Sequence, residues 1–198
     1  MILIVAIIAG VGVALLRGGS LKRLSDLPLR LGWVAVAALV AQAYAIYAPV
    51  DRLEDDRTLH VALIMGSYAA LLAVVWANRG LAGMPILAVG LVLNLAVMAA
   101  NGGLMPVSRE TVLAAGVSTA ETVPAEGARL PRSKDVLLSA ERTRLWVLSD
   151  AIVLPPPVAR VCSLGDIAIA LGAFLLLQAA MAPKRETRLR EDAEAQAA

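Results

Sequence analysis

Long apolar runs alternate with short polar connections along this chain. Each run holds sixteen to twenty residues with almost no charged side chain, and about 20 apolar residues in a helix can cross the hydrocarbon core of a bilayer. We expect helices at five such runs: residues 1–16, 31–48, 59–77, 81–100 and 167–182. The pattern therefore predicts an all-α integral membrane protein with five transmembrane helices.

The first run is short for a transmembrane helix, but we interpret it as a retained one. No basic residue precedes it and no small-residue cleavage site is obvious, whereas a secretory signal peptide begins with positive charge. This interpretation places the N-terminus on the outer side of the membrane.

The charged connections predict an orientation. The connection over residues 17–30 carries four basic side chains against one acid, residues 48–57 carry four acids against two arginines, and the tail from Lys184 onward is again basic at its start. Cytoplasmic loops carry the excess of lysine and arginine, so we expect the C-terminus to be cytoplasmic. Aromatic residues are expected at the two membrane interfaces: Trp33 and Trp76 at the inner one, Tyr44 and Tyr47 at the outer one.

Residues 101–165 leave the membrane on its outer side. Asn-Gly-Gly at 101–103 is a turn signal, and we expect a short helix over 108–115, a loop over 117–133 and an amphipathic helix over 135–148 that lies on the outer interface. The predicted organisation is four transmembrane helices over 1–100, a partly helical outer loop region over 101–165, a fifth transmembrane helix over 166–183, and a disordered cytoplasmic tail over 184–198.

The composition supports a membrane protein and excludes several functional classes. The chain is 59% hydrophobic and 17% charged, with a mean hydropathy of +0.75, which is more apolar than a soluble domain of this size can bury. A net charge of +2 with scattered arginines argues against nucleic acid. One cysteine and one histidine exclude an internal disulfide and Cys- or His-cluster metal sites. We expect no metal and no cofactor. An alanine- and arginine-rich, lysine-poor chain is typical of a GC-rich bacterium, which predicts the bacterial cytoplasmic membrane.

Two carboxylates, Asp150 and Asp166, are the strongest candidates for chemistry. Carboxylates at a membrane boundary are energetically costly, so their presence there indicates a structural or functional role. Asp166 closes an S-x-x-D capping box that starts at Ser163, so its role can be structural. Asp150 alone is typical of a solvated loop acid. Prolines 155–157 stiffen the connection between them in an extended form. Two carboxyls that met would share one proton, which is the state that an aspartic hydrolase uses.

Asn101, Arg144 and Arg160 are candidates for contact with a substrate. Asn101 can orient a substrate or a carboxylate, or it can simply be the turn residue that ends a helix. Arg144 and Arg160, together with Arg109 and Arg142, can neutralise lipid phosphates or form a solvated face. His60 is expected to be an interfacial hydrogen-bonding residue, and Cys162 a small apolar residue.

Two resemblances involve these residues. The segments NGGLMPVS (101–108), RTRLWVLSD (142–150) and SLGDIAIALG (163–172) resemble a family of bacterial membrane proteins known as domain of unknown function 5317. SDAIVLPPPVARVCSLGDIAIALG also resembles the end of lipoprotein signal peptidase (signal peptidase II). That resemblance implies that Asp150 and Asp166 form a catalytic dyad and that Asn101 faces the substrate. The G-N-x-x-D-R motif of that family is absent here, and five helices replace its four.

Two functions of different classes follow. The first is a membrane hydrolase at the outer face, acting through Asp150 and Asp166 on a lipid-linked or membrane-protein substrate. The second is a non-catalytic module: an accessory subunit, or a binding protein for membrane lipids or small ligands. A transporter or channel is a third alternative. A direct approach of the two carboxyls would favour the hydrolase, and aspartates each locked to an arginine would favour the module.

Overall fold

The computed structural model describes residues 2–47, 57–154 and 160–183. The acidic connection, the three prolines and the basic tail discussed above lie outside these residues, apart from Arg57 and Pro183. The described residues are mostly helical. The long helices are α1 (Ile2–Leu16), α2 (Gly32–Tyr47), α4 (Arg57–Ala77), α5 (Met84–Ala100) and α7 (Leu164–Met181).

These helices fall where the apolar runs predict them. By length and composition, α4 and α7 can each cross a membrane, while α1, α2 and α5 are shorter apolar helices. A 3-10 helix, η1 (Leu21–Asp26), follows α1. The all-α prediction is wrong in one respect, because the segment between α5 and α7 contains short strands.

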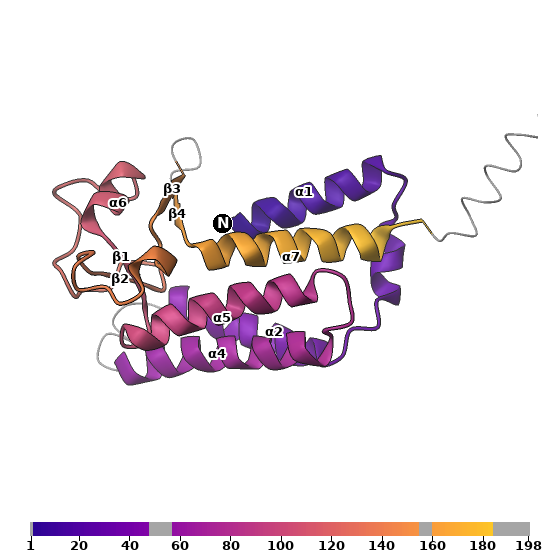
Figure 1. The fold of residues 1–198 in the computed structure, drawn as a ribbon, viewed down its shortest axis with the longest axis horizontal. Helices are drawn as coiled ribbons and strands as arrows, with labels where there is room; N and C mark the ends of the chain where they lie inside the picture. Colours follow the sequence, from indigo (N-terminus) through magenta and orange to yellow (C-terminus); the bar gives the residue numbers. More distant parts are fainter. Residues whose placement is uncertain (1, 48–56, 155–159, 184–198) are drawn as a thin grey trace, which may run out of the picture.

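The long helices pack in an order that differs from their order in the chain. Extensive contacts join α1 to α7, α7 to α5, α5 to α4, and α4 to α2. Figure 1 shows this row, with α1 and α7 above α5 and α4. The consecutive helices α1 and α2 are therefore the two outermost members of the row.

Glycines allow α5 and α7 to pack closely along their length. A Cβ atom added at Gly90 would lie 2.5 Å from the carbonyl oxygen of Gly165, and one added at Gly172 would lie 2.7 Å from the amide nitrogen of Leu87. Both contacts are with backbone, which cannot move aside. Small residues allow helices to approach closely, and they do so at these two positions. At Gly12 and Gly66, by contrast, an added Cβ meets no described atom within 4 Å.

This difference gives a matched test of helix packing. Gly90→Ala is expected to lower the free energy of unfolding by about 1–3 kcal/mol because the added methyl group overpacks the contact. Gly12→Ala should be neutral or slightly stabilising, since alanine favours a helix over glycine. Thermal unfolding of both variants in the same detergent checks this. Equal melting temperatures would contradict the packing.

Residues 101–154 and 160–163, here called the cap, fold over one end of the helices. Strand β1 (Met105–Val107) pairs in parallel with β2 (Asp135–Leu137), and β3 (Ile152–Leu154) pairs antiparallel with β4 (Arg160–Cys162). The helix predicted over 108–115 is confirmed as α6 (Arg109–Ala114), which Ser108 caps. A small hydrophobic core of four side chains holds the cap together: Val107, Val112, Leu130 and Leu137.

The amphipathic helix predicted over 135–148 is wrong. Asp135–Leu137 form β2 instead, because their backbone pairs with β1, and only η2 (Trp146–Leu148) is helical. Leu145 has a left-handed backbone with φ +56°, which an α-helix does not accommodate. Trp146 and Val147 are exposed.

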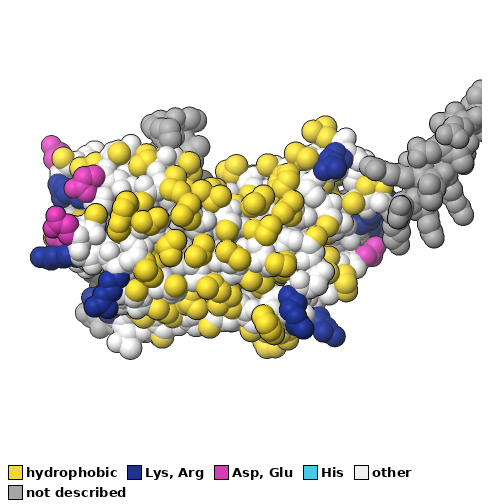
Figure 2. Space-filling model, in the orientation of Figure 1, with side chains coloured by type: hydrophobic (Ala, Val, Ile, Leu, Met, Phe, Trp, Pro, Cys, Tyr) yellow, Lys and Arg dark blue, Asp and Glu magenta, His cyan; other side chains and the backbone are white. Residues whose placement is uncertain are grey.

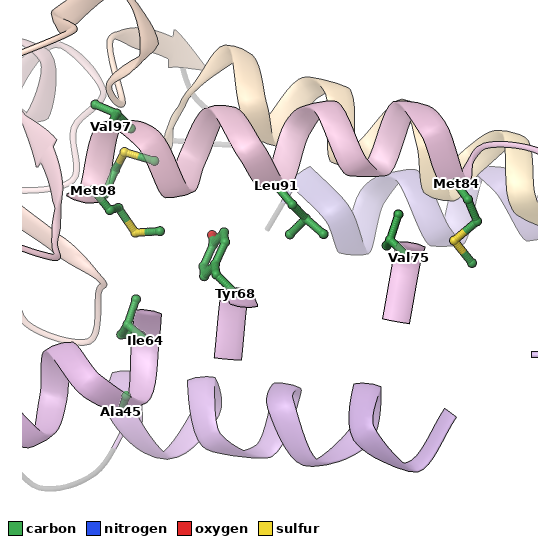
Figure 3. Packing of buried hydrophobic residues seen from close by; sticks show 9 residues of the cluster. Ala45, Ile64, Tyr68, Val75, Met84, Leu91, Val97 and Met98 are labelled. Carbon is green, nitrogen blue, oxygen red and sulfur yellow. The ribbon is translucent and has the colours of Figure 1, made fainter. Parts of the chain in front are cut away.

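The main hydrophobic core joins the helices to the cap. It contains Tyr68 of α4 together with Leu91, Val97 and Met98 of α5, and Met105 of β1 belongs to the same cluster. Figure 3 shows Tyr68 projecting from α4 towards α5. Arg129 adds a second connection, since its guanidinium lies 2.7 Å from Nδ1 of His60 at the start of α4. His60 therefore forms a hydrogen bond at a helix end, as predicted.

Candidate functional site

The only described lysine in the cap lies among carboxylates. Lys134 directly precedes β2, and its Nζ donates a hydrogen bond to Oδ2 of Asp150 at 3.1 Å and lies 3.5 Å from Oδ1 of Asp135. The Asp150 side chain is 3% exposed and that of Lys134 is 18% exposed. A third carboxylate, Asp166, lies close enough to act electrostatically on Lys134. We call Lys134, Asp135, Asp150 and Asp166 the carboxylate cluster.

Strand β1 sets the spacing of this cluster. On one side, the amide of Met105 donates to the carbonyl of Lys134, and on the other side the amide of Asp150 donates to the carbonyl of Pro106, both at 3.1 Å. Segments that are distant in sequence are thereby fixed on a common strand. Ser133 also donates its hydroxyl to Oδ2 of Asp135 at 2.6 Å.

Asp166 is held by the start of α7 and by α5. Ser163 and Asp166 form both hydrogen bonds of a capping box, which confirms the structural role predicted from the sequence. The side-chain amide of Asn94 donates to Oδ1 of Asp166 at 2.7 Å, and the Ser163 hydroxyl donates to Oδ1 of Asn94 at 2.9 Å. Asn94 is fully buried, and its side chain bonds with the start of α7.

Negative charge is in excess within the cluster. Burial disfavours the charged form of Lys134, but Asp150, Asp166 and Asp135 outweigh it and raise the pKa of the ammonium well above its usual value. Burial also raises the pKa of Asp150 well above that of a solvated aspartic acid; Lys134 opposes this shift, and Asp135 and Asp166 add to it. Asp150 can therefore keep a proton at a pH where a solvated carboxyl has lost it.

Two oxygens of the cluster have no hydrogen-bond partner among the described residues: Oδ1 of Asp135 and Oδ1 of Asp150. A buried acceptor left without a partner costs about 1–3 kcal/mol. The side chains of Asp150 and Asp135 lie near enough to each other for a hydrogen bond, so a proton carried by Asp150 can be shared with Asp135. The structure thus pairs Asp150 with Lys134 and Asp135, neither of which the sequence singled out.

A cavity of about 260 Å³ lies beside the cluster, and we call it the helix pocket. Lys134, Asp166 and Arg160 line it from the cap side, and Tyr68 and Gln42 line it from within the helices. The rest of its lining is apolar and comes from all five long helices and from β3 and β4: Ile2, Leu3, Leu39, Leu71, Leu91, Leu154, Val161 and Ile169.

The residues predicted as a site divide into two groups. Asp150 and Asp166 both face Lys134, and Arg160 lines the helix pocket with Asp166. Asn101 and Arg144 form a separate group: Asn101 donates to the carbonyl of Arg144 at 2.8 Å and accepts from its amide at 2.9 Å. Asn101 also donates to the carbonyl of Val97, so it does serve to end α5.

Cysteine and metal chemistry find no support in the described residues. Cys162 is buried, and burial together with Asp166 and Asp150 raises the pKa of its thiol to about 11, so the thiol stays protonated and unreactive. Within the described ranges, no group of three or more histidine, cysteine, aspartate or glutamate side chains is arranged to hold a metal ion.

Sequence reasoning missed Lys134, Asp135 and Tyr68 as parts of the site. Tyr68 sits in an apolar run and looks like core. Lys134 follows a segment without any period, and its one distinguishing feature is that it is a lysine in a chain where fifteen of the eighteen basic residues are arginine.

Comparisons with known proteins identify one family. A model of a family of unknown function, DUF5317, matches residues 26–178, a range that contains all three segments on which that resemblance rests. No curated protein and no solved structure matches the chain. The resemblance to signal peptidase II, and with it the catalytic dyad, stays a prediction.

Proposed function

This chain belongs to the DUF5317 family of unknown function, and from its own geometry we propose that it is a membrane-embedded binding module for an amphiphilic molecule. The observation that carries this proposal is the helix pocket, whose walls are apolar and whose cap side is polar and charged. Five membrane-spanning helices would hold this pocket, with the cap on the outer face of the bacterial cytoplasmic membrane.

The surface supports an embedding of all five helices. Figure 2 shows a wide hydrophobic band, with charged side chains gathered at the two ends of the molecule. Trp33 and Trp76 are 75% and 70% exposed at the end away from the cap, as membrane-interface aromatics are. Arg79 lies over the Trp76 ring, 5.1 Å from its centroid. Helices of 15 to 17 residues rise about 23–26 Å, a mismatch that local bilayer thinning accommodates.

The packing order of the helices supports entry from the bilayer. The pocket is lined by Ile2 and Leu3 of α1 and by Leu39 and Gln42 of α2, the two outermost helices of the row. Leu39 is 50% exposed as well, so the pocket and the outer surface meet at this side chain. A hydrocarbon chain can reach the pocket between α1 and α2 without crossing the cap.

The polar groups support an amphiphile over a purely apolar ligand. Lys134, Tyr68 and Gln42 offer donors, and Asp166 offers an acceptor. A volume of about 260 Å³ lies just below the ~300–1,000 Å³ typical of small-molecule sites. It suits a small uncharged or zwitterionic head with the first part of one chain.

The same geometry favours binding over hydrolysis by Asp150 and Asp166. Lys134 holds the Asp150 carboxyl, while Asn94 and Ser163 hold that of Asp166. An aspartic hydrolase needs its two carboxyls free to share one proton and one water. A binding site needs only fixed polar groups, and these are fixed.

Adjacent residues of α2 offer a matched test. Leu39→Trp fills the pocket from its exposed side, whereas Val40→Trp adds the same side chain at a 63% exposed position that does not line the pocket. Photo-crosslinking to a diazirine-bearing monoacylglycerol in nanodiscs is expected to label α1 and α2 near the pocket. Leu39→Trp should lower this labelling by at least about tenfold.

Equal labelling of both variants would overturn the proposal. So would release of a cleaved product from a lipid-linked peptide in an Asp150- and Asp166-dependent manner, because this would show the hydrolase instead.

A further inference from the structure

A second cavity, of about 420 Å³, lies between the cap and the ends of α4 and α5, and three arginines line it. Arg57 comes from the start of α4, and Arg142 and Arg144 come from the segment before η2. The other lining residues are uncharged, and none of the described residues that line the cavity is acidic. We call it the arginine pocket.

The local fold brings these arginines together. The paired hydrogen bonds between Asn101 and the main chain of Arg144 fix Arg144 against the end of α5. Gly102 follows with φ +79°, and a Cβ added there would lie 3.6 Å from Nη2 of Arg57. The guanidinium of Arg57 therefore lies over the glycine turn.

Nearby negative charge only partly compensates the three guanidinium groups. Arg142 approaches Glu126 at 3.8 Å, but their side chains are 73% and 42% exposed, and such exposed pairs contribute little. The C-terminal end of α5 carries about half a negative elementary charge. Among the described residues, the local charge balance around the arginine pocket therefore stays positive.

We propose that the arginine pocket binds a phosphate group. Guanidinium groups match phosphate oxygens with paired hydrogen bonds, and three of them, supplied by the start of α4 and by the segment before η2, can surround one phosphate. The phosphate can belong to a lipid head group or to a free phosphate ester. The arginine pocket shares no lining residue with the helix pocket, so this inference does not rest on the proposed function.

The test uses the full chain in a maltoside detergent. Inorganic phosphate is titrated at constant ionic strength, and in a second arm native mass spectrometry compares retention of phosphatidylglycerol with that of a phosphate-free diacylglycerol with the same chains. We expect selective retention of phosphatidylglycerol. Binding of inorganic phosphate as well would identify the phosphate group alone as sufficient, and retention of phosphatidylglycerol without it would identify a lipid head group.

Arg144→Gln is expected to weaken phosphate or phosphatidylglycerol binding by at least about tenfold, since a hydrogen bond to a charged group is lost. The paired hydrogen bonds with Asn101 involve only the main chain of Arg144, so we expect this variant to keep its fold. The affinity of Arg144→Lys should lie between that of the wild-type protein and that of Arg144→Gln, because lysine keeps the charge and loses the paired hydrogen-bond geometry.

Arg109→Gln is the control, because Arg109 lies in α6 and donates to the carbonyl of Ala120 outside the pocket. It should change the affinity less than about twofold. No binding of either probe, or equal losses in Arg144→Gln and Arg109→Gln, would overturn the proposal and leave the arginines as partners of the α5 carbonyls.

Discussion

Replacing Lys134 with methionine is expected to lower the free energy of unfolding by about 3–5 kcal/mol, the range measured when one partner of a buried ion pair is removed. Lys134 is the cation that faces Asp135, Asp150 and Asp166 together. Methionine has a similar length and fills the same space, so the loss reports the charge more than the packing. Without the ammonium, the charges of the three carboxylates repel one another with less compensation.

Lys22→Met is the matched control for this variant. Lys22 lies exposed in η1, and the same substitution there should change stability by less than about 0.5 kcal/mol. Chemical unfolding of both variants in one detergent, followed by circular dichroism, measures the difference. A Lys134→Met protein as stable as Lys22→Met would mean that the carboxylates are neutral or solvated without the lysine.

The loss in Lys134→Met should shrink as the pH falls. Burial already raises the pKa of Asp150 in the wild-type protein, and removing its cation raises that pKa further. The folded variant then binds more protons than the unfolded chain above the ordinary carboxyl pKa of about 3.9, so its stability decreases as the pH rises through the folded pKa. We expect part of the lost stability to return between about pH 7 and pH 5. A loss that is constant over this range would exclude a protonation effect.

The long helices and the capping box at the start of α7 follow from local sequence, and for that reason they could be predicted. An apolar run of the right length indicates a helix without reference to any distant segment, and the Ser163–Asp166 capping box joins residues three positions apart. The four strands could not be predicted in the same way. Met105–Val107 pairs with Asp135–Leu137, about thirty residues away, and no local pattern encodes a parallel partner at that distance.

The amphipathic helix predicted over 135–148 shows how this limit produces a wrong prediction. Val136, Leu137, Leu145 and Leu148 have spacings that fit one face of a helix. The first two are instead buried because β2 packs in the cap core. Periodicity describes which residues are buried, and short strands joined by turns can reproduce it by coincidence.

Prediction of the carboxylate cluster from the sequence was limited in the same way. Asp150 and Asp166 could be chosen from the sequence because a carboxylate beside an apolar run is unusual. Their partners could not, since Lys134 joins the site through its pairing with β1 and Asn94 joins it from the middle of α5. The sequence thus predicted the acids but not the groups that decide their protonation.

Replacing Asp166 with alanine is the second change with a large expected effect, about 2–4 kcal/mol of unfolding free energy. The start of α7 loses a capping interaction, which is typically worth about 0.5–2 kcal/mol. The amide of Asn94, fully buried, loses its acceptor on Asp166, and an unsatisfied buried donor costs about 1–3 kcal/mol. Asp166→Asn should lose less, because its remaining carbonyl oxygen can still accept one of these hydrogen bonds.

Asp26→Ala, in exposed η1, is the control for the removal of an acid. Ser163→Ala should cost a similar amount to Asp166→Ala, and the double variant should lose less than both together, because the two side chains share one hydrogen-bonded unit with Asn94. If Asp166→Ala is instead as stable as Asp26→Ala, the carboxylate contributes nothing to the fold. A half-buried acid that lines the helix pocket would then contribute nothing to stability, and that result would favour a chemical role for Asp166 over the binding module proposed above.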